Sequence, residues 1–155
     1  MLLGVAGSGK TTVGSLVAAQ LGVPFADADD FHTPEAVARM AAGLALDDEM
    51  RRPWLERLHE VLVAHASTGL VLACSALRRA YREQLTGGLT GVVCVALVAP
   101  PDVLRRRLES RVGHYAGPEL LASQLATLEL GDDVVTVDTT RPVADVVAAV
   151  VAALG

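Results

Sequence analysis

The segment GVAGSGKT at residues 4–11 constrains the fold of this chain more than any other. It fits the pattern G-x-x-x-x-G-K-[ST] at every position, a pattern that follows a β-strand and opens an α-helix. Its glycines let successive backbone N–H groups converge on phosphate oxygens, and the helix N-terminus adds the positive end of its dipole. In this arrangement Lys10 reaches the outer phosphates and Thr11 presents a hydroxyl to Mg²⁺. The motif therefore predicts a nucleoside triphosphate site that comprises Gly7, Ser8, Gly9, Lys10, Thr11 and Thr12.

Residue usage narrows the class of nucleotide-binding protein. Lys10 is the only lysine in the chain, and the chain contains no asparagine. The base-reading Asn-Lys-x-Asp segment of GTPases is therefore absent. A small chain with an arginine-rich segment after the phosphate motif indicates phosphoryl transfer to a small molecule instead.

Composition limits the partners and the location that we expect. The 155 residues are 52% hydrophobic and carry a formal net charge of -5, which argues against nucleic acid as a partner. The longest apolar run, residues 143–154, is shorter than the ~20 residues that span a bilayer, so we expect no membrane association. Cys74 and Cys94 both lie in apolar runs and are expected to be buried, reduced thiols. Together these features predict a cytoplasmic protein without a signal peptide.

Apolar runs alternate with segments of helical period along the whole chain. Strands are expected at residues 1–6, 23–26, 70–74, 91–98 and 134–137. Helices are expected at residues 10–21, 34–43, 47–65, 77–85, 101–111, 118–130 and 142–154. Continuous apolar strands separated by helices predict a parallel sheet covered on both faces, in a single α/β domain over residues 1–155.

A pair of acidic residues follows the second expected strand. Asp27 and Asp29 are two positions apart, so an extended backbone sends both carboxylates to the same face. This lies at the carboxyl end of a strand, where open α/β sheets place their ligands. One carboxylate would hold Mg²⁺ through water while the other orients or deprotonates an acceptor hydroxyl. The alternative interpretation is a solvated turn that caps the next helix.

A local group of arginines follows the fourth expected strand. Arg107 and Arg111 are four residues apart on one helix face and precede the glycine-containing segment 113–117. Guanidinium groups suit the charge that develops during phosphoryl transfer, so we predict a closing lid over about residues 107–120. The neighbouring Arg105 and Arg106 are expected to face solvent.

Other polar residues allow two interpretations each. Arg51, Arg78 and Arg82 would bind a carboxylate of the substrate, or they are surface residues. His32 and His114 would donate hydrogen bonds to the substrate, or they are structural.

The sequence resembles the bacterial gluconate kinases (gluconokinases), relatives of shikimate kinase among the nucleotide-kinase-like P-loop proteins. The resemblance covers nearly the whole chain, and the segments PWL and CSAL are more specific to this family than the phosphate loop. It rests on GVAGSGKT at residues 4–11, DADDFH at 27–32, RMAAG at 39–43, LDDEMRRPWL at 46–55, ACSALRRAYR at 73–82, RLESRVGHY at 107–115 and LASQ at 121–124.

This resemblance implies a three-layer fold and an activity. The sheet would have five parallel strands in the order 2-3-1-4-5, and ATP with Mg²⁺ would phosphorylate D-gluconate to 6-phosphogluconate. Family members are often dimers, so a homodimer is among the expectations.

The resemblance also implies roles for particular residues. The catalytic residues would be Lys10, Asp29, Arg107 and Arg111, and the metal ligands Thr11 and Asp27. Arg107, Arg141 and Pro142 would contact the nucleotide, the last two in a segment near adenine. The substrate-binding residues would be Asp29, His32, Arg51, Arg78, Arg82 and His114.

The sequence also departs from the family pattern. Ala36, Met50 and Ala28 stand where asparagine, aspartate and glycine are usual. Two alternatives therefore stay open: a related kinase for shikimate or another sugar acid, and a nucleotide-binding paralogue without catalysis. The chain lacks the Gly-Gly-Gly acceptor loop of shikimate kinases, which counts against the shikimate alternative.

Overall fold

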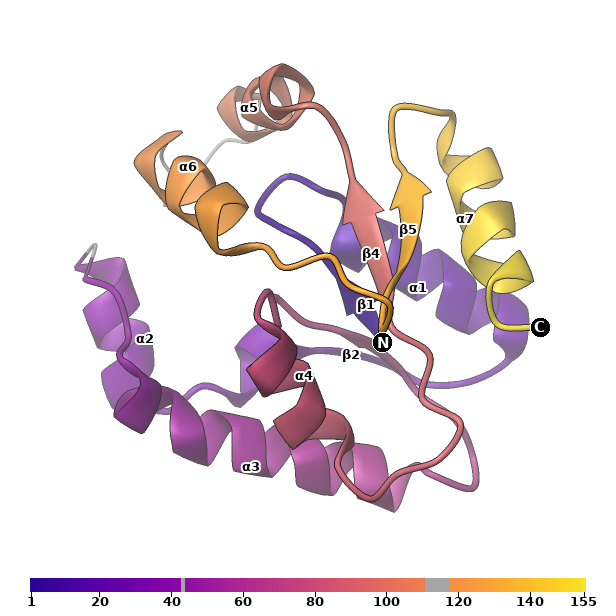
Figure 1. Cartoon of the computed structure of the whole chain (residues 1–155), viewed down its shortest axis with the longest axis horizontal. Helices are drawn as coiled ribbons and strands as arrows, with labels where there is room; N and C mark the ends of the chain where they lie inside the picture. Colours follow the sequence, from indigo (N-terminus) through magenta and orange to yellow (C-terminus); the bar gives the residue numbers. More distant parts are fainter. Residues whose placement is uncertain (43, 111–117) are drawn as a thin grey trace.

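The computed structural model describes residues 1–42, 44–110 and 118–155 (Figure 1). The strands are β1 (Leu2–Leu3), β2 (Phe25–Asp27), β3 (Val71–Ala73), β4 (Val95–Val98) and β5 (Val135–Asp138). The helices are α1 (Lys10–Leu21), α2 (Pro34–Ala41), α3 (Asp48–Ala64), α4 (Arg79–Thr86), α5 (Pro101–Glu109), α6 (Pro118–Thr127) and α7 (Val143–Ala152). A 3₁₀ turn, η1 (Ala28–Phe31), follows β2.

The strands form one five-stranded sheet in the order β2-β3-β1-β4-β5, with every neighbouring pair parallel. This confirms the expected fold class and strand order. The short β1 lies at the centre, where Leu2 is paired with Ala73 of β3 and Val95 of β4. Because all strands run the same way, the loops after β1, β2 and β3 meet at one edge of the sheet.

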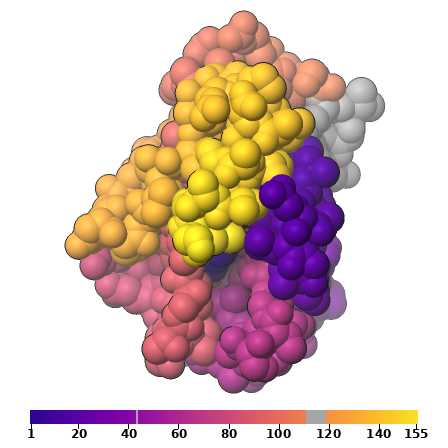
Figure 2. Space-filling view, turned by 90° about the vertical axis from the view of Figure 1, so that its right-hand side faces the viewer, coloured from indigo at the N-terminus to yellow at the C-terminus, as the bar shows by residue number. Residues whose placement is uncertain are grey.

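Successive side chains of each strand point to opposite faces of the sheet, and a hydrophobic core lies on each face. Leu2 packs with α1 and α7 on one face, whereas the adjacent Leu3 packs with α3 and α4 on the other. Figure 2 shows the C-terminal helix α7 beside α1 on the first of these faces. The two faces together confirm the three-layer arrangement.

A third, smaller core lies at the carboxyl edge of the sheet. Val5, which follows β1, packs there with Leu77, with Leu104 of α5 and with Leu121 of α6. Figure 1 shows α5 and α6 on the same side of the molecule as the loop that follows β1. This core therefore fixes both helices next to the phosphate loop.

Local sequence signals place most helix ends correctly. Thr33 accepts a hydrogen bond from the Ala36 N–H at the start of α2, and Asp47 accepts one from the Met50 N–H at the start of α3. Both are helix caps that satisfy otherwise unpaired N–H groups. Pro53 lies inside α3, where its missing N–H interrupts the hydrogen-bond pattern without ending the helix.

Four of the five strands, β1 to β4, are shorter than the apolar runs predicted. β1 covers two residues of the expected 1–6, and β4 begins at Val95 rather than at residue 91. Val92 and Val93 are apolar because they pack against the cores, not because they pair with another strand. Cys74 and Cys94 are buried and free, as expected, and burial raises the pKa of the Cys74 thiol to about 12. In the described ranges, no helix combines the length and the apolarity that crossing a membrane requires.

Candidate active site

The phosphate loop connects β1 to α1 at the carboxyl edge of the sheet. Gly9 is the N-cap of α1 with φ 95°, a left-handed conformation that glycine adopts without strain. At Gly4, an added Cβ would lie 2.6 Å from the Ser8 Oγ and 2.8 Å from the Leu97 carbonyl oxygen. These glycines thus allow a turn tight enough for its amides to converge.

A cleft of about 360 Å³ opens beside this loop. Its lining includes Gly7, Ser8, Gly9, Thr12, Arg107, Thr139 and Arg141. The Ser8 hydroxyl oxygen is buried and makes no hydrogen bond within the described residues, so a polar ligand atom would satisfy it. The cleft brings together loop residues and segments more than a hundred residues away. Pro142, also predicted to contact nucleotide, is the residue before α7 and is not among the lining residues.

Arg107 of α5 is one of the residues that line this cleft. Its guanidinium donates to the Thr139 hydroxyl at 2.9 Å and also to the Thr139 backbone carbonyl. Thr139 is buried and donates its own hydroxyl to the Val98 carbonyl at 3.2 Å. Arg107 is therefore half-buried and oriented, whereas Arg105 and Arg106 are exposed, as expected.

Thr11 lies at the start of α1 and Asp27 at the end of β2, and the two side chains are in contact. The Thr11 hydroxyl donates to the Asp27 Oδ2 at 2.9 Å. Mg²⁺ commonly takes one or two protein oxygens and completes its shell with phosphate oxygens and water. The hydroxyl and carboxylate present here fit such a metal bound beside the loop. Lys10, on the same helix turn, donates to the Val5 carbonyl at 3.2 Å.

Asp29 lies in η1, two residues after Asp27. Its backbone N–H donates to the Asp27 Oδ1 at 3.2 Å, which fixes the turn, while its own side chain remains 79% exposed. Neighbouring protein groups reduce the hydration of this carboxylate although its atoms are accessible to solvent, and the Asp27 charge adds to that effect. Both raise the pKa of Asp29 above its usual value, and the charge of Lys10 opposes them.

His32 lies beside Asp29 and is 7% exposed. Its ring stacks on Trp54 at 4.6 Å between centroids, and its Nε2 is 4.0 Å from the Asp29 Oδ1. Trp54 is held by a hydrogen bond from its Nε1 to the Ala28 carbonyl at 2.7 Å. Burial lowers the pKa of His32, and the charge of Arg51 lowers it further.

Arg51 and Arg78 meet next to this histidine, where the start of α3 faces the start of α4. Both guanidinium groups lie 5.6 Å from the centroid of the Tyr81 ring. The structure therefore brings these two arginines together, as a carboxylate-binding role requires.

The chain is similar to several known proteins over most of its length. The sequence profile of the shikimate kinase family matches residues 6–149. The probable gluconokinase of Mus musculus is 39% identical over an alignment of 176 positions, which covers 99% of this chain and 96% of that protein. The thermoresistant gluconokinase of Escherichia coli K12 is 37% identical over 157 residues, covering 97% and 90%. The crystal structure of a gluconokinase from Sinorhizobium meliloti 1021 superposes with a TM-score of 0.87 at 39% identity, covering 99% and 89%.

The chain belongs to the gluconokinase family. It is accordingly a phosphotransferase of the kinase class that acts on an alcohol group. The gluconokinase resemblance stated from the sequence is confirmed, and the match to the shikimate kinase profile confirms the wider P-loop relationship.

Arg82 was expected to bind the substrate, and the structure contradicts this expectation. It is 2% exposed, donates from Nε and Nη2 to the Asp133 carboxylate at 2.6 and 3.2 Å, and donates from Nη1 to the carbonyls of Ala76 and Leu77. Because these partners use its donors inside the protein, Arg82 joins α4 to the segment before β5 instead of facing a substrate.

Two predicted site residues, Arg111 and His114, lie outside the described residues, as does the segment 113–117. The lid expected over about residues 107–120 therefore stays a prediction. Gln124 of α6, by contrast, is described and was missed as a site residue: its Oε1 accepts the Ala6 N–H of the phosphate loop at 2.6 Å.

Tyr81 was also missed, although the sequence carried a signal for it. It follows Arg78 by three residues, a spacing that puts both side chains on one helix face. Thr139 carried no such signal, because its partner Arg107 is distant in sequence.

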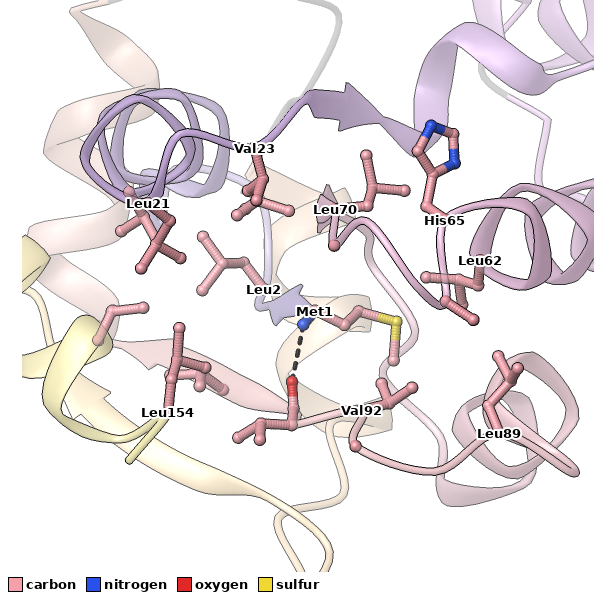
Figure 3. A pocket seen from close by; sticks show the side chains of 18 of the residues that line it. Met1, Leu2, Leu21, Val23, Leu62, His65, Leu70, Leu89, Val92 and Leu154 are labelled. Atoms are coloured by element: carbon pink, nitrogen blue, oxygen red, sulfur yellow. Dashed lines mark hydrogen bonds between the residues drawn. The ribbon is translucent and has the colours of Figure 1, made fainter.

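An apolar cavity of about 260 Å³ lies at the opposite, amino-terminal edge of the sheet (Figure 3). Leu2, Leu21, Val23 and Leu154 point into it, and the Met1 ammonium donates to the Val93 carbonyl at 2.7 Å on its wall. None of the residues predicted from the sequence to form the active site lines this cavity.

Proposed function

We propose that this chain transfers the γ-phosphoryl group of ATP to a hydroxyl of D-gluconate, yielding 6-phosphogluconate and ADP. One observation carries the proposal. His32 lies 4.0 Å from the Asp29 carboxylate and is close enough to Arg51 for that charge to lower its pKa, so Asp29 and the pair Arg51–Arg78 are both near this histidine. This arrangement suits an acceptor that has a hydroxyl at one end and a carboxylate at the other.

The nucleotide side is assigned to the loop and the cleft. The loop amides and Lys10 would bind the β- and γ-phosphates, and Thr11 with Asp27 would hold Mg²⁺, which supplies charge neutralisation when bound. Arg107, which lines the cleft, would approach the transferred group. Arg141 would contact the nucleotide where it lines that cleft.

The transfer itself needs a group that takes a proton. In the proposed step the acceptor hydroxyl gives its proton to the Asp29 carboxylate while its oxygen bonds to the γ-phosphorus. The bond from that phosphorus to the β–γ bridging oxygen breaks, and ADP leaves with the electron pair. The raised pKa of Asp29 makes its carboxylate a better base than that of an ordinary aspartate.

The acceptor side is assigned to the two arginines. Arg51 and Arg78 would bind the carboxylate of gluconate by charge-assisted hydrogen bonds. His32, held against Trp54, would contact an intermediate hydroxyl. The reaction is placed in the cytoplasm, where ATP and reduced cysteines are usual.

A panel of acceptors tests the substrate. ADP release would be measured with D-gluconate, other sugar acids, shikimate and the uncharged polyol D-sorbitol. We expect turnover with gluconate to exceed that with every other compound. Turnover on another acid with none on gluconate would reject the substrate and keep the reaction class.

A pair of variants tests the proposed base. Asp29→Asn should lower kcat by about two to four orders of magnitude because it removes the proton acceptor, with little change in KM for ATP. Asp30→Asn is the matched control, since this neighbour is exposed in the same turn. Equal effects of the two substitutions would refute the role of Asp29.

A further inference from the structure

The contacts between α3 and α4 contain a feature that carboxylate binding alone does not require. Tyr81 donates its hydroxyl to the Asp48 Oδ1 at 2.6 Å. Arg51 donates from Nη1 to the Tyr81 oxygen at 3.0 Å, and Arg78 donates to the same oxygen at 3.5 Å. We call Arg51, Arg78, Tyr81 and Asp48 the arginine cradle.

The two guanidinium groups of the cradle use few of their donors. A guanidinium carries five N–H groups, yet each makes a single hydrogen bond to the described part of the protein, and both bonds go to one hydroxyl. Their nitrogens approach the Asp48 Oδ1 only to 3.7 and 3.9 Å, longer than the ~2.8 Å of a direct charge-assisted bond. Asp48 is thus bound directly by Tyr81 and only loosely by the arginines.

The cradle already contains a carboxylate at the place where the proposed function needs one. Two arginines and one aspartate leave it with a net positive charge. Asp48 is 72% exposed, so solvent can receive its carboxylate. It also lies in the first turn of α3, where the helix dipole favours a negative charge whether or not the arginines are near.

We propose that Asp48 is a placeholder for the acceptor's carboxylate. Without acceptor, Asp48 and Tyr81 hold the two guanidinium groups together; when the acid binds, its carboxylate replaces that of Asp48. Tyr81 then turns its hydroxyl to the incoming carboxylate and acts as a specificity-determining residue. The inference rests on the proposed function, because it requires that the acceptor be an acid.

This arrangement has a consequence for selectivity. An acid replaces Asp48 with an equivalent partner, so the net charge of the arginine cradle stays the same. An uncharged polyol cannot make that exchange and leaves the placeholder in its position. Asp48 therefore competes with the acid for the two arginines and lowers the affinity for the acid. It does not compete with a polyol, which has no carboxylate.

Asp48→Asn tests the placeholder against a matched control. Dissociation constants would be measured by calorimetry, and KM and kcat by ADP release, for the best acid acceptor in the panel. We expect Asp48→Asn to lower both Kd and KM for the acid by roughly three- to tenfold, with kcat and KM for ATP unchanged. Glu49→Gln removes the other acidic charge of the same helix turn and should leave these values unchanged, because Glu49 makes no hydrogen bond or ion pair within the described residues.

Tyr81→Phe supplies a second, independent arm. It keeps the ring under both guanidinium groups and removes the hydroxyl that joins them. We expect KM for the acid to rise by roughly threefold to tenfold, while KM for D-sorbitol stays the same. A structural role alone would change both acceptors equally.

The possible outcomes separate this inference from the proposed function. If Asp48→Asn and Glu49→Gln strengthen acid binding equally, the effect is one of general electrostatics and the inference is overturned. Weaker binding of the acid by Asp48→Asn would also overturn it. Failure of wild-type enzyme to phosphorylate gluconate would reject the proposed substrate, and the variants would then be compared on whichever acid is turned over. If no acid binds, both proposals fail together.

Discussion

Arg82 of α4 and the pair Arg51–Arg78, where the starts of α3 and α4 meet, have different surroundings and therefore opposite roles. Arg82 is buried and donates four hydrogen bonds, to the Asp133 carboxylate and to two backbone carbonyls. Arg51 and Arg78 are only partly covered and share one tyrosine hydroxyl. All three looked equivalent in the sequence.

The difference shows what makes an arginine available to a ligand. A guanidinium whose donors are satisfied inside the protein is part of the scaffold, because removing it leaves buried acceptors unpaired. A guanidinium that is already oriented but has unused donors can bind an anion with little further loss of side-chain conformational entropy. The comparison thus predicts that stability depends on Arg82 and that acceptor affinity depends on Arg51 and Arg78.

The largest expected effect is on stability. Arg82→Met keeps much of the side-chain volume and should lower the free energy of unfolding by about 3 kcal/mol, since it leaves Asp133 and two carbonyls without their donor. Urea unfolding measures this. Arg79→Met is the control: Arg79 forms ion pairs with Glu83 and Asp132 but is half exposed, so this variant should lose much less stability. Similar losses would break the comparison.

The partner of Arg82 gives a smaller effect that depends on pH. Asp133→Asn should lower the free energy of unfolding by about 2 kcal/mol at neutral pH, because the neutral amide still accepts one hydrogen bond. The Arg82 hydrogen bond lowers the pKa of Asp133 below its ordinary 3.8. Its contribution is therefore present above pH 3.8 and lost as pH falls through the lower folded-state value. A wild-type advantage that persists in stronger acid would contradict this linkage.

The two partly covered arginines should affect acceptor binding instead. Arg51→Gln and Arg78→Gln are each expected to raise KM for the acid acceptor by roughly tenfold, the loss of one charge-assisted contact. The free energy of unfolding should change by less than about 0.5 kcal/mol. Steady-state kinetics and urea unfolding on the same samples measure both. A loss of stability without a change in KM would assign these arginines to the scaffold as well.

The smallest expected effect is that of salt on acceptor binding, and it tests the same difference between buried Arg82 and the partly covered Arg51 and Arg78. Raising ionic strength from about 0.05 to 0.5 M shortens the screening length to a few ångströms and should raise KM for the acid about twofold. The stability difference between wild type and Arg82→Met should change less, because that pair is buried. Equal salt sensitivity of the two quantities would show that exposure does not separate the two groups.

Much of the fold was predictable because its signals are local. The phosphate motif placed α1 at Lys10–Leu21, and the caps Thr33 and Asp47 placed the starts of α2 and α3. Strand lengths were less predictable. Val92 and Val93 are as apolar as strand residues, and only the position of neighbouring strands determines that pairing begins at Val95.

The site was predictable on the nucleotide side and less so on the acceptor side. Thr11 and Asp27 were expected near each other as ligands of one metal ion, and they are hydrogen-bonded. Arg82 was misassigned because its partner Asp133 lies fifty-one residues away. The contact between Gln124 and Ala6, 118 residues apart, was likewise beyond local reasoning.

The sequence by itself determined the phosphate loop, the parallel sheet and the family, because each depends on residue types at short spacings or along the whole chain. Only the tertiary structure decided which arginines are buried and which remain open to a ligand. The reason is that a guanidinium's role depends on how many acceptors reach it, and those acceptors come from segments that folding alone brings near.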